Sequence, residues 1–330
     1  MKIEECKDLS LYSRIGIGGR ARFFSGVKTN DECLEALKFA EAMDVPVITI
    51  GEGSNTAFED GVIEALVLKV LYSQAHVVLD EENSGHVSCD GGMKLQTFVS
   101  ELANLGIDAS NFEGIPGTVA GAIVNNSGSN KDAIGNYLLN STVVDRAGNI
   151  SRLSIEDMCY GVRDSALRVA GDCVVLKGEF HFPKGSAEEI FSKIARRILL
   201  RRSKQPKGLT LGSTFRNPPG NGLTAGQLID MAGFKGYRKG NLVVSPEHAN
   251  WLINLARGSS TAKDLRDLMD DIREGVQRLM GIQLEKEIQI VGNNFVMEGN
   301  APFFRLSHLS HFRPKGIICP ETARKGTRPE

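Results

Sequence analysis

Apolar residues recur every three or four positions in three segments before Pro206, which predicts three amphipathic helices. The first covers 30–44 after a capping Asn or Asp, and its apolar positions are Cys33, Leu34, Leu37 and Ala40. The second ends at Gly106, and its apolar positions are Leu95, Phe98, Val99, Leu102 and Leu105. The third is capped by Ser186, and its apolar positions are Ile190, Ile194, Ile198 and Leu199.

Short apolar runs between these helices predict strands. The run VPVITI stops at the glycines of GEGSN, and ALVLKV covers 65–70. From STVVDRAGN at Ser141 to CVVLKGEFHF at Cys173, strand patterns flank the turn sequence DRAGN, as in an antiparallel sheet. The chain therefore mixes helix and strand first and then enters a mainly antiparallel region.

The pattern changes beyond Pro206, and we expect a domain boundary at 205–212. After a glycine-rich loop, we predict helices at 223–232 and 261–280 and strands at 241–244 and 250–255. The segment LEKEIQIVG reads as a further strand, with Glu285 and Glu287 on one face by the period of two. The segment after Gly292 contains scattered Gly and Pro and a basic end, and we interpret it as an appended tail, ordered only in part.

The composition argues against several classes of protein. The chain has 330 residues, 24% of them charged, and a net charge of −1, which favours a multidomain enzyme over a nucleic-acid or anionic-membrane binder. Six cysteines without CxxC pairs predict reduced thiols in a cytoplasmic protein, and six histidines without ligand spacing predict no metal site. The N-terminus lacks an export signal, and no apolar run is long enough to span a membrane.

The most unusual segment is EGIPGTVAGAIVNNSGS at 113–129. It holds four glycines and no charge after Glu113. Such a segment lets backbone N–H groups approach a phosphate closely, as a dinucleotide site requires, but a tight buried turn explains it equally well. A second glycine loop, GEGSNTAFED from Gly51, favours an extended ligand touched by several loops. GIGGRA at Gly16 fits GxGxxA, yet no helix of the right period follows it and no acidic residue ends a second strand, so we reject a Rossmann site.

Four further positions offer chemistry, each with a plainer alternative. Ser213, in LGSTFRNPPGNG, is a proton donor or only a turn residue, and the turn is favoured on local sequence alone. Arg163 beside Asp164 fits a surface ion pair, and Glu287 fits a solvated strand edge. His248 is the one histidine for which we expect a role beyond structure or surface.

Taken in chain order, seven segments resemble one enzyme family over about residues 10–292. They are GSN, GIPGTVAGAIVNNSG, VRDS, GSTFRNP, AGQLIDMAGFKGYRKG, VSPEHANWLIN and LEKEIQIVG. They resemble UDP-N-acetylenolpyruvoylglucosamine reductases (UDP-N-acetylmuramate dehydrogenases), flavoenzymes of bacterial peptidoglycan precursor synthesis, in their shorter type. The resemblance implies an α+β fold: a two-part FAD-binding region of the vanillyl-alcohol oxidase type followed by a C-terminal α+β substrate-binding domain. The expected division is 1–70 and 71–205 for FAD, 206–295 for substrate and 296–330 for the tail.

The resemblance also implies roles for individual residues. Ser213 is the implied proton donor, Arg163 polarises the substrate carboxylate, and Glu287 is the acid opposite it. The implied contacts of noncovalent FAD are Gly51, Gly53, Ser54, Asn55, Gly114, Ile115, Pro116, Gly117, Thr118, Gly121, Asn126 and Gly128. The implied contacts of the UDP-sugar are Arg216 and Asn217, with Tyr237, Arg238 and His248 as weaker candidates.

The implied reaction passes a hydride from NADPH through FAD to the enolpyruvyl ether of UDP-N-acetylglucosamine and gives UDP-N-acetylmuramate. Two alternatives stay open. A paralogous FAD oxidoreductase would act on a related enol ether or another nucleotide-linked substrate, because Val162 and Ser110 replace residues usual in the family. A nonenzymatic nucleotide-binding protein would not need Ser213, Arg163 and Glu287 together. We expect a monomer or weak homo-oligomer that binds neither nucleic acid nor membrane.

Overall fold

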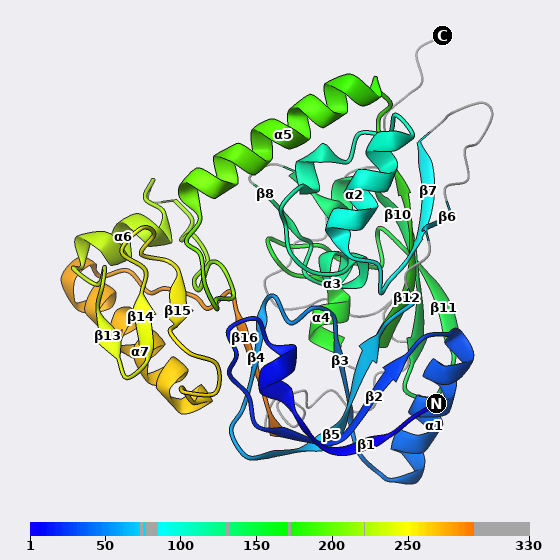
Figure 1. The fold of residues 1–330 in the computed structure, drawn as a ribbon, viewed down its shortest axis with the longest axis horizontal. Coiled ribbons are helices and arrows are strands. Elements are labelled where there is room, and N and C mark those ends of the chain that lie inside the picture. The colour runs from blue at the N-terminus through cyan, green and yellow to red at the C-terminus, as the bar shows by residue number, and fades with distance from the viewer. Residues whose placement is uncertain (73–74, 77–84, 130–131, 171–172, 221, 294–330) are drawn as a thin grey trace.

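The computed structural model describes residues 1–72, 75–76, 85–129, 132–170, 173–220 and 222–293 (Figure 1). The expected tail at 296–330 lies outside the described residues. The α-helices are α1 (Asn30–Ala42), α2 (Leu95–Asn104), α3 (Val119–Val124), α4 (Ala166–Ala170), α5 (Ala187–Lys204), α6 (Ala225–Met231) and α7 (Ala262–Met280). Short 3-10 turns are η1 (Leu9–Tyr12), η2 (Ser110–Phe112) and η3 (Ile134–Asn136).

The first sheet has the strand order β1-β2-β5-β3. Its strands are β1 (Glu4–Asp8), β2 (Arg20–Val27), β3 (Val47–Ile50) and β5 (Val62–Val70). β1 is antiparallel to β2, whereas β2, β5 and β3 run parallel. The apolar face of α1 packs here, as its spacing predicts, but the predicted cap was wrong: Thr29, not an Asn or Asp, accepts the hydrogen bond from the backbone N–H of Glu32 at 3.2 Å.

The second sheet is antiparallel, as predicted, with the order β11-β10-β12-β7-β6. Its strands are β6 (Ala75–His76), β7 (His86–Asp90), β10 (Leu138–Asp145), β11 (Ile150–Ser154) and β12 (Cys173–His181). A short ladder of β8 (Gly128–Ser129) and β9 (Asp132–Ala133) lies beside η2. The predicted Ser186 cap is confirmed, because its Oγ accepts from the N–H of Glu189 at 3.2 Å.

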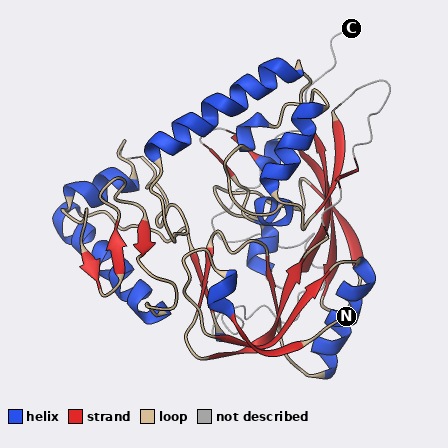
Figure 2. Ribbon diagram, viewed as in Figure 1, coloured by secondary structure: helices blue, strands red, loops and turns tan. Residues whose placement is uncertain are grey.

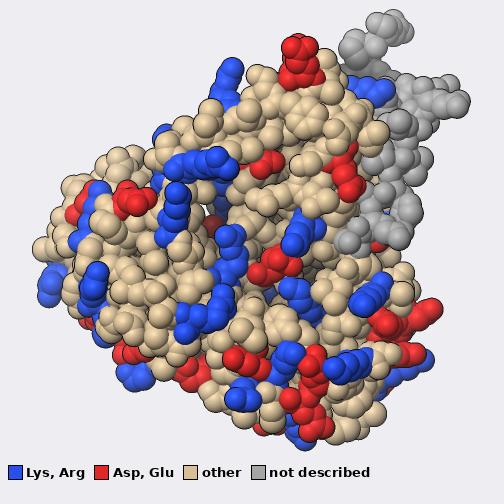
Figure 3. Space-filling view, viewed as in Figure 1, with Lys and Arg blue, Asp and Glu red and all other residues tan. Residues whose placement is uncertain are grey.

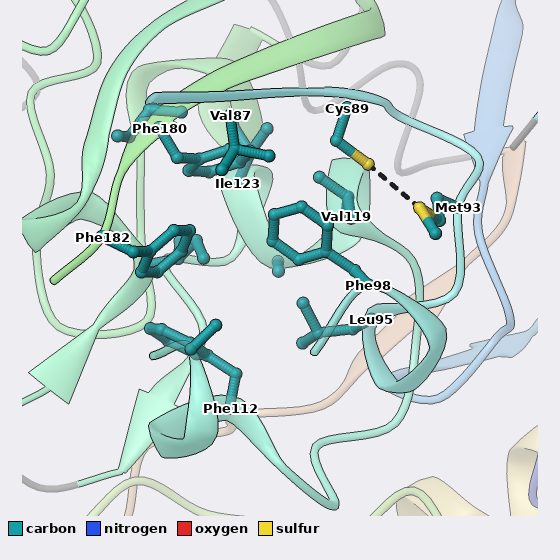
Figure 4. Packing of buried hydrophobic residues seen from close by; sticks show 14 of the residues in the cluster. Val87, Cys89, Met93, Leu95, Phe98, Phe112, Val119, Ile123, Phe180 and Phe182 are labelled. Atoms are coloured by element: carbon teal, nitrogen blue, oxygen red, sulfur yellow. Dashed lines mark hydrogen bonds between the residues drawn. The ribbon is translucent and has the colours of Figure 1, made fainter. Parts of the chain in front are cut away.

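Aromatic rings fill the core between the second sheet and its helices. Figure 4 shows Phe98 of α2 and Phe112 of η2 near Phe180 of β12 and Phe182, which follows that strand. Ring centroids of Phe98 and Phe180 lie 5.5 Å apart, and those of Phe180 and Phe182 lie 5.7 Å apart. Burial of such large apolar areas fixes the helices on the sheet and so fixes the glycine segment that joins them.

The third sheet is small and lies apart from the two larger sheets, with α6 and α7 around it (Figure 2). Its strands, β13 (Arg238–Lys239), β14 (Leu242–Val244) and β15 (Leu252–Asn254), are antiparallel. The expected start of α7 is confirmed, because Thr261 caps it in a capping box with Asp264. In Figure 1, α5 runs from the second sheet toward this lobe, so it connects the two parts.

The last described strand returns to the N-terminal part. β16 (Gln289–Val291) pairs in parallel with β4 (Thr56–Phe58), and Ile15, Ile17 and Ala57 belong to the core of the third sheet. The predicted strand across LEKEIQIVG was wrong at its start, because residues 285–287 pair instead with the loop before α6. The N–H of Arg216 donates to Glu285 O at 2.9 Å, and the N–H of Glu287 donates to Thr214 O at 2.8 Å.

Asp60 supplies a test of this interdomain contact. Its carboxylate accepts hydrogen bonds from the N–H groups of Ala262 at 2.9 Å and Lys263 at 3.1 Å, at the N-terminus of α7. Asp60→Ala should lower the free energy of unfolding by about 1 kcal/mol, the usual loss for a helix cap. Differential scanning calorimetry of the FAD-loaded protein measures the change. Glu188→Ala, an exposed acidic residue in the first turn of α5, is the control; equal melting temperatures in both variants would contradict the contact.

Candidate active site

A cavity of about 540 Å³ lies where the glycine loops meet the segments 205–208 and 210–213. In Figure 3 the surface is hollowed between the lobe of α6 and α7 and the rest of the molecule, with Lys and Arg side chains at the rim. The volume suits a small-molecule or cofactor site. Its lining consists of Arg14, 51–56, Gln96, 114–118, Gly121, Asn125, Ser127, Arg163, Arg168, 205–208, 210–213, Trp251 and Glu287.

The two glycine loops lie against each other and leave no room for side chains. A Cβ on Gly51 would lie 2.6 Å from Thr118 Oγ1, and a Cβ on Gly53, whose φ is +60°, would lie 1.9 Å from the carbonyl oxygen of Tyr12. The hydroxyl of Ser54 donates to Pro116 O at 3.1 Å, which ties the loops together. The backbone of both loops therefore forms the cavity wall, as close approach of a phosphate requires.

The lining fits FAD. Its charged side chains are four basic and two acidic: Arg14, Arg163, Arg168, Lys207, Glu52 and Glu287. This excess of cations suits a ligand with two phosphates. Ten of the twelve residues expected at FAD line the cavity, all of them in 51–55, 114–118 or at Gly121.

Asn126 and Gly128, also expected at FAD, are not among the lining residues. The Nδ2 of Asn126 donates to Gly161 O at 2.9 Å, and its Oδ1 accepts from the N–H of Gly135 at 3.1 Å. A Cβ on Gly128 would lie 2.0 Å from Asp132 O across the short β8–β9 ladder. In the structure, both residues fix the loops behind the site.

The three expected catalytic residues come together in the cavity. The Nε of Arg163 lies 3.2 Å from Glu287 Oε1, and Ser213 lines the same cavity. The backbone of Ser213 forms an isolated antiparallel β-bridge with Trp251. The side chain of Asn250 accepts a hydrogen bond from the N–H of Phe215 at 2.9 Å and donates one to Phe215 O at 2.8 Å. Asn250 is buried, so this reciprocal pair sets the position of the whole GSTF loop.

Burial and charge act in opposite directions on Glu287. Only 19% of its side chain is exposed, and this loss of hydration raises the pKa of its carboxyl above the usual value. The nearby guanidinium groups of Arg163, Arg216 and Arg168 lower that pKa but do not cancel the effect of burial. The solvated strand edge considered from sequence is therefore wrong for Glu287, because its carboxyl is partly withdrawn from water.

The five residues expected at the UDP-sugar are not among the cavity's lining residues, and four of them make other contacts in the structure. Arg216 Nη2 donates to Arg163 O at 3.3 Å, so Arg216 is next to the site. Asn217 Oδ1 accepts from the N–H of Ala225 at 2.9 Å, and the Tyr237 hydroxyl donates to Asp271 at 3.3 Å. His248 Nδ1 accepts from the N–H of Asn250 at 3.2 Å, and burial lowers the pKa of His248. Arg238 lies exposed on β13.

Sequence reasoning missed several lining residues. Arg168 and Trp251 are the clearest cases, since each contacts a segment that bears an expected catalytic residue. Arg168 lies five positions after Arg163, and Trp251 is the one tryptophan of the chain. Neither position had a local signal for a site, because both reach the cavity only through the packing of distant segments.

Comparison with known proteins first defines the class of protein to which the chain belongs. The FAD binding domain family matches residues 22–154, which include both glycine loops. Together with the cavity, this match defines an FAD-binding protein, and the predicted α+β fold class with its C-terminal substrate-domain fold is confirmed.

The family follows from the whole chain. The C-terminal domain family of UDP-N-acetylenolpyruvoylglucosamine reductase matches residues 205–291. The reductase of that name from Lachnoclostridium phytofermentans is 33% identical over 287 residues, 86% of this chain and 91% of that protein. The one from Streptococcus pyogenes serotype M5 is 32% identical over 303 residues, 88% and 97% of the two chains. The chain belongs to the UDP-N-acetylenolpyruvoylglucosamine reductase family and is an FAD-dependent oxidoreductase.

A solved structure agrees with this assignment. The crystal structure of UDP-N-acetylenolpyruvylglucosamine reductase from Thermus caldophilus superposes with a TM-score of 0.72 at 29% identity, covering 88% of this chain and 99% of that one. Within the described ranges, no helix combines the length and hydrophobicity needed to cross a membrane. The same ranges hold no group of three His, Cys, Asp or Glu side chains placed to bind a metal ion.

Gly117 provides a test of the cofactor site. Its φ is +124°, and a Cβ there would lie 3.1 Å from Ser54 Oγ, so a side chain at 117 enters the gap between the loops. Gly117→Glu should abolish FAD retention, because it adds both bulk and a negative charge beside phosphates. Flavin absorbance per mole of purified protein measures retention.

Gly117→Gln is the matched control, because it introduces the same bulk and the same backbone strain without the charge. We expect it to retain more FAD than the Glu variant, and circular dichroism should show both variants folded. Parental FAD content in Gly117→Glu would show that this segment does not face the cofactor.

Proposed function

We propose that this chain reduces the enolpyruvyl ether of UDP-N-acetylglucosamine to UDP-N-acetylmuramate with NADPH, a step in peptidoglycan precursor synthesis. The observation that supports it most directly is the 3.2 Å contact of Arg163 with Glu287 in the cavity that Ser213 also lines. The enolpyruvyl group accepts a hydride only when its carboxylate is polarised. Arg163 offers a cation and Glu287 offers a proton for that purpose.

The groups in the cavity have separate roles in the proposed reaction. FAD supplies hydride transfer, which no amino-acid side chain can provide. The glycine loops at 51–55 and 114–118 hold its nucleotide, and Asn55 links them to the acid by donating from Nδ2 to Glu287 O at 3.3 Å. Arg163 binds the substrate carboxylate, and the protonated Glu287 donates a hydrogen bond to the same group, so negative charge that develops on it is stabilised.

Ser213 holds the proton that completes the reaction. Its loop is fixed by Asn250, and Ser213 lines the cavity wall. We assign it the delivery of a proton to carbon 2 of the enolpyruvyl group. The proton on a serine hydroxyl is available at neutral pH, and it is replaced from solvent after each turnover.

The remaining assignments concern the rest of the substrate and the chain. Arg216 and Asn217 contact the UDP-sugar, with Tyr237, Arg238 and His248 further along the same lobe. The domains are 1–70 and 71–205 for FAD and 206–295 for substrate, with a tail at 296–330. The core between the second sheet and its helices lies wholly within 71–205, which supports this division. The boundaries are crossed by Val144, Val174 and Leu176, which share a core with the first sheet, and by β16, which pairs with β4. We place the protein in the cytoplasm, as a monomer or weak homo-oligomer without nucleic-acid or membrane partners.

A paralogous reductase with another enol ether as substrate is the second candidate. The observation that favours it is Val162, which stands before Arg163 where the family usually has an aromatic residue and is 82% exposed. No ring from this position can then contact the sugar. Turnover of the UDP-enolpyruvyl sugar at rates below those of other enol ethers would favour this candidate.

Ser213→Ala separates the two half-reactions. If the hydroxyl only delivers a proton to carbon 2, NADPH should bleach the flavin absorbance at a near-parental rate. Reoxidation by the UDP-enolpyruvyl sugar should slow by roughly a hundredfold to ten-thousandfold, the usual range for a lost general acid. Stopped-flow absorbance measures each half. Equal slowing of both halves would make Ser213 a structural turn residue whose loss distorts the pocket.

The proposed role of Glu287 as a hydrogen-bond donor predicts a pH dependence. Burial raises the pKa of Glu287, and a substrate carboxylate beside it adds a like charge that raises it further. Because the protonated form is required, reoxidation by substrate should be fastest below this pKa and fall as the pH rises through it. Glu287→Gln keeps an N–H donor and should show a flat profile in that range. Identical profiles in the parent and in Glu287→Gln would exclude Glu287 as the titrating group.

A further inference from the structure

Arg168 has no part in the steps described above, yet it contacts both residues of the central pair. It lies on α4, and its side chain lines the cavity. Its Nη1 donates to Arg163 O at 2.6 Å, and its Nη2 donates to Glu287 O at 3.4 Å. One guanidinium thus spans the two backbones that bear the ion-paired side chains.

The backbone of Arg163 needs such support. Its φ is +56°, a left-handed conformation that costs a residue with a Cβ about 1–2 kcal/mol. Strain of this kind persists only where the surroundings enforce it. The neighbouring Val162 is 82% exposed, so its packing cannot hold this conformation. Hydrogen bonds to the carbonyl of Arg163 can. Its shorter hydrogen bond comes from Arg168, and a longer one at 3.3 Å comes from Arg216.

Arg168 is itself fixed to the cofactor loops. The buried hydroxyl of Ser165 donates to Val124 O at 2.6 Å, at the end of α3, and accepts from the N–H of Arg168 at 3.2 Å. The turn before it is held by Asn126, which donates to Gly161 O at 2.9 Å. The position of Arg168 is therefore set by the same glycine segment that forms the cavity wall.

We propose that Arg168 is a positioning residue for substrate reduction: by bridging the carbonyls of Arg163 and Glu287, it holds their side chains in the register that receives the substrate carboxylate. This inference rests on the proposed function. An arginine suits the task because its planar fork presents several donors in fixed directions, whereas a lysine concentrates its charge on one flexible nitrogen.

Two variants distinguish the bridging hydrogen bonds of Arg168 from its positive charge. Arg168→Met removes the donors and the charge, and Arg168→Lys keeps the charge but cannot span both carbonyls. The other charges that act on Glu287, Arg163 and Arg216, stay in place in both variants, as does Asp164, which lies 3.9 Å from Arg216. Arg152→Met is the matched control, because Arg152 pairs with Glu179 on the second sheet and is absent from the cavity lining.

The test uses the full chain loaded with FAD, in stopped flow. Arg168→Lys keeps the positive charge at the cavity wall and should retain FAD and be reduced by NADPH at a near-parental rate. In both Arg168 variants, reoxidation by the UDP-enolpyruvyl sugar should slow by roughly a hundredfold, the effect of a misplacement of about 1 Å. Arg152→Met should match the parent in both halves. Parental reoxidation in Arg168→Lys would overturn the bridging role, and equal slowing of both halves would make Arg168 merely structural.

A second measurement does not depend on the substrate. Carboxyl-¹³C glutamate labelling follows the titration of Glu287 by NMR in the FAD-loaded protein, with Glu287→Gln for assignment. The guanidinium of Arg163 lowers the pKa of Glu287. If Arg168 holds Arg163 beside Glu287, Arg168→Lys should weaken this effect, and the pKa of Glu287 should rise above its value in the parent. An unchanged titration in Arg168→Lys would overturn the inference. A parent that does not reduce the UDP-sugar would defeat the proposed function alone, since this titration would still decide the role of Arg168.

Discussion

The contact between Arg163 and Glu287 joins a turn between β11 and β12 of the second sheet to a segment that precedes β16, and the site is arranged around it. Glu287 keeps its place because its N–H is bound by Thr214 and its carbonyl is bound by Asn55. Arg163 keeps its place because its carbonyl accepts hydrogen bonds from two guanidinium groups. An ion pair withdrawn from water is stable only with such additional hydrogen bonds, so the scaffold and the chemistry depend on the same contacts.

The surrounding charges explain how one carboxyl can be both paired and protonatable. Three arginines favour the ionised form of Glu287, and burial favours the neutral form more strongly. A fully hydrated glutamate here would only neutralise Arg163 and compete with the substrate. Burial shifts the balance of Glu287 toward its neutral form, which is the form that the proposed reaction needs, while the arginines keep an excess of positive charge for an anionic ligand.

The glycine loops and the catalytic pair are parts of one structure. Ser54 binds the two loops to each other, Asn55 binds the first loop to Glu287, and Ser165 binds the end of α3 to the helix that holds Arg168. The wall that receives the cofactor therefore sets the distance at which the substrate carboxylate is held. Hydride transfer requires such control, since reacting atoms must approach to about 3–3.5 Å.

The local sequence determined the elements with strong periodicity or caps. These include α5 with Ser186, α7 with Thr261 and the antiparallel sheet from β10 to β12, because apolar spacing and capping act over a few residues. It also marked the two glycine loops as places where the backbone makes a close approach, although for the segment at 113–129 taken alone a ligand and a tight buried turn were equally good explanations. Only the tertiary structure decided that Glu287 is withdrawn from water, that Asn126 fixes a turn and that Arg168 reaches two backbones. Burial and hydrogen bonding at these positions come from segments far away in the chain, and no local pattern encodes which distant segments will meet.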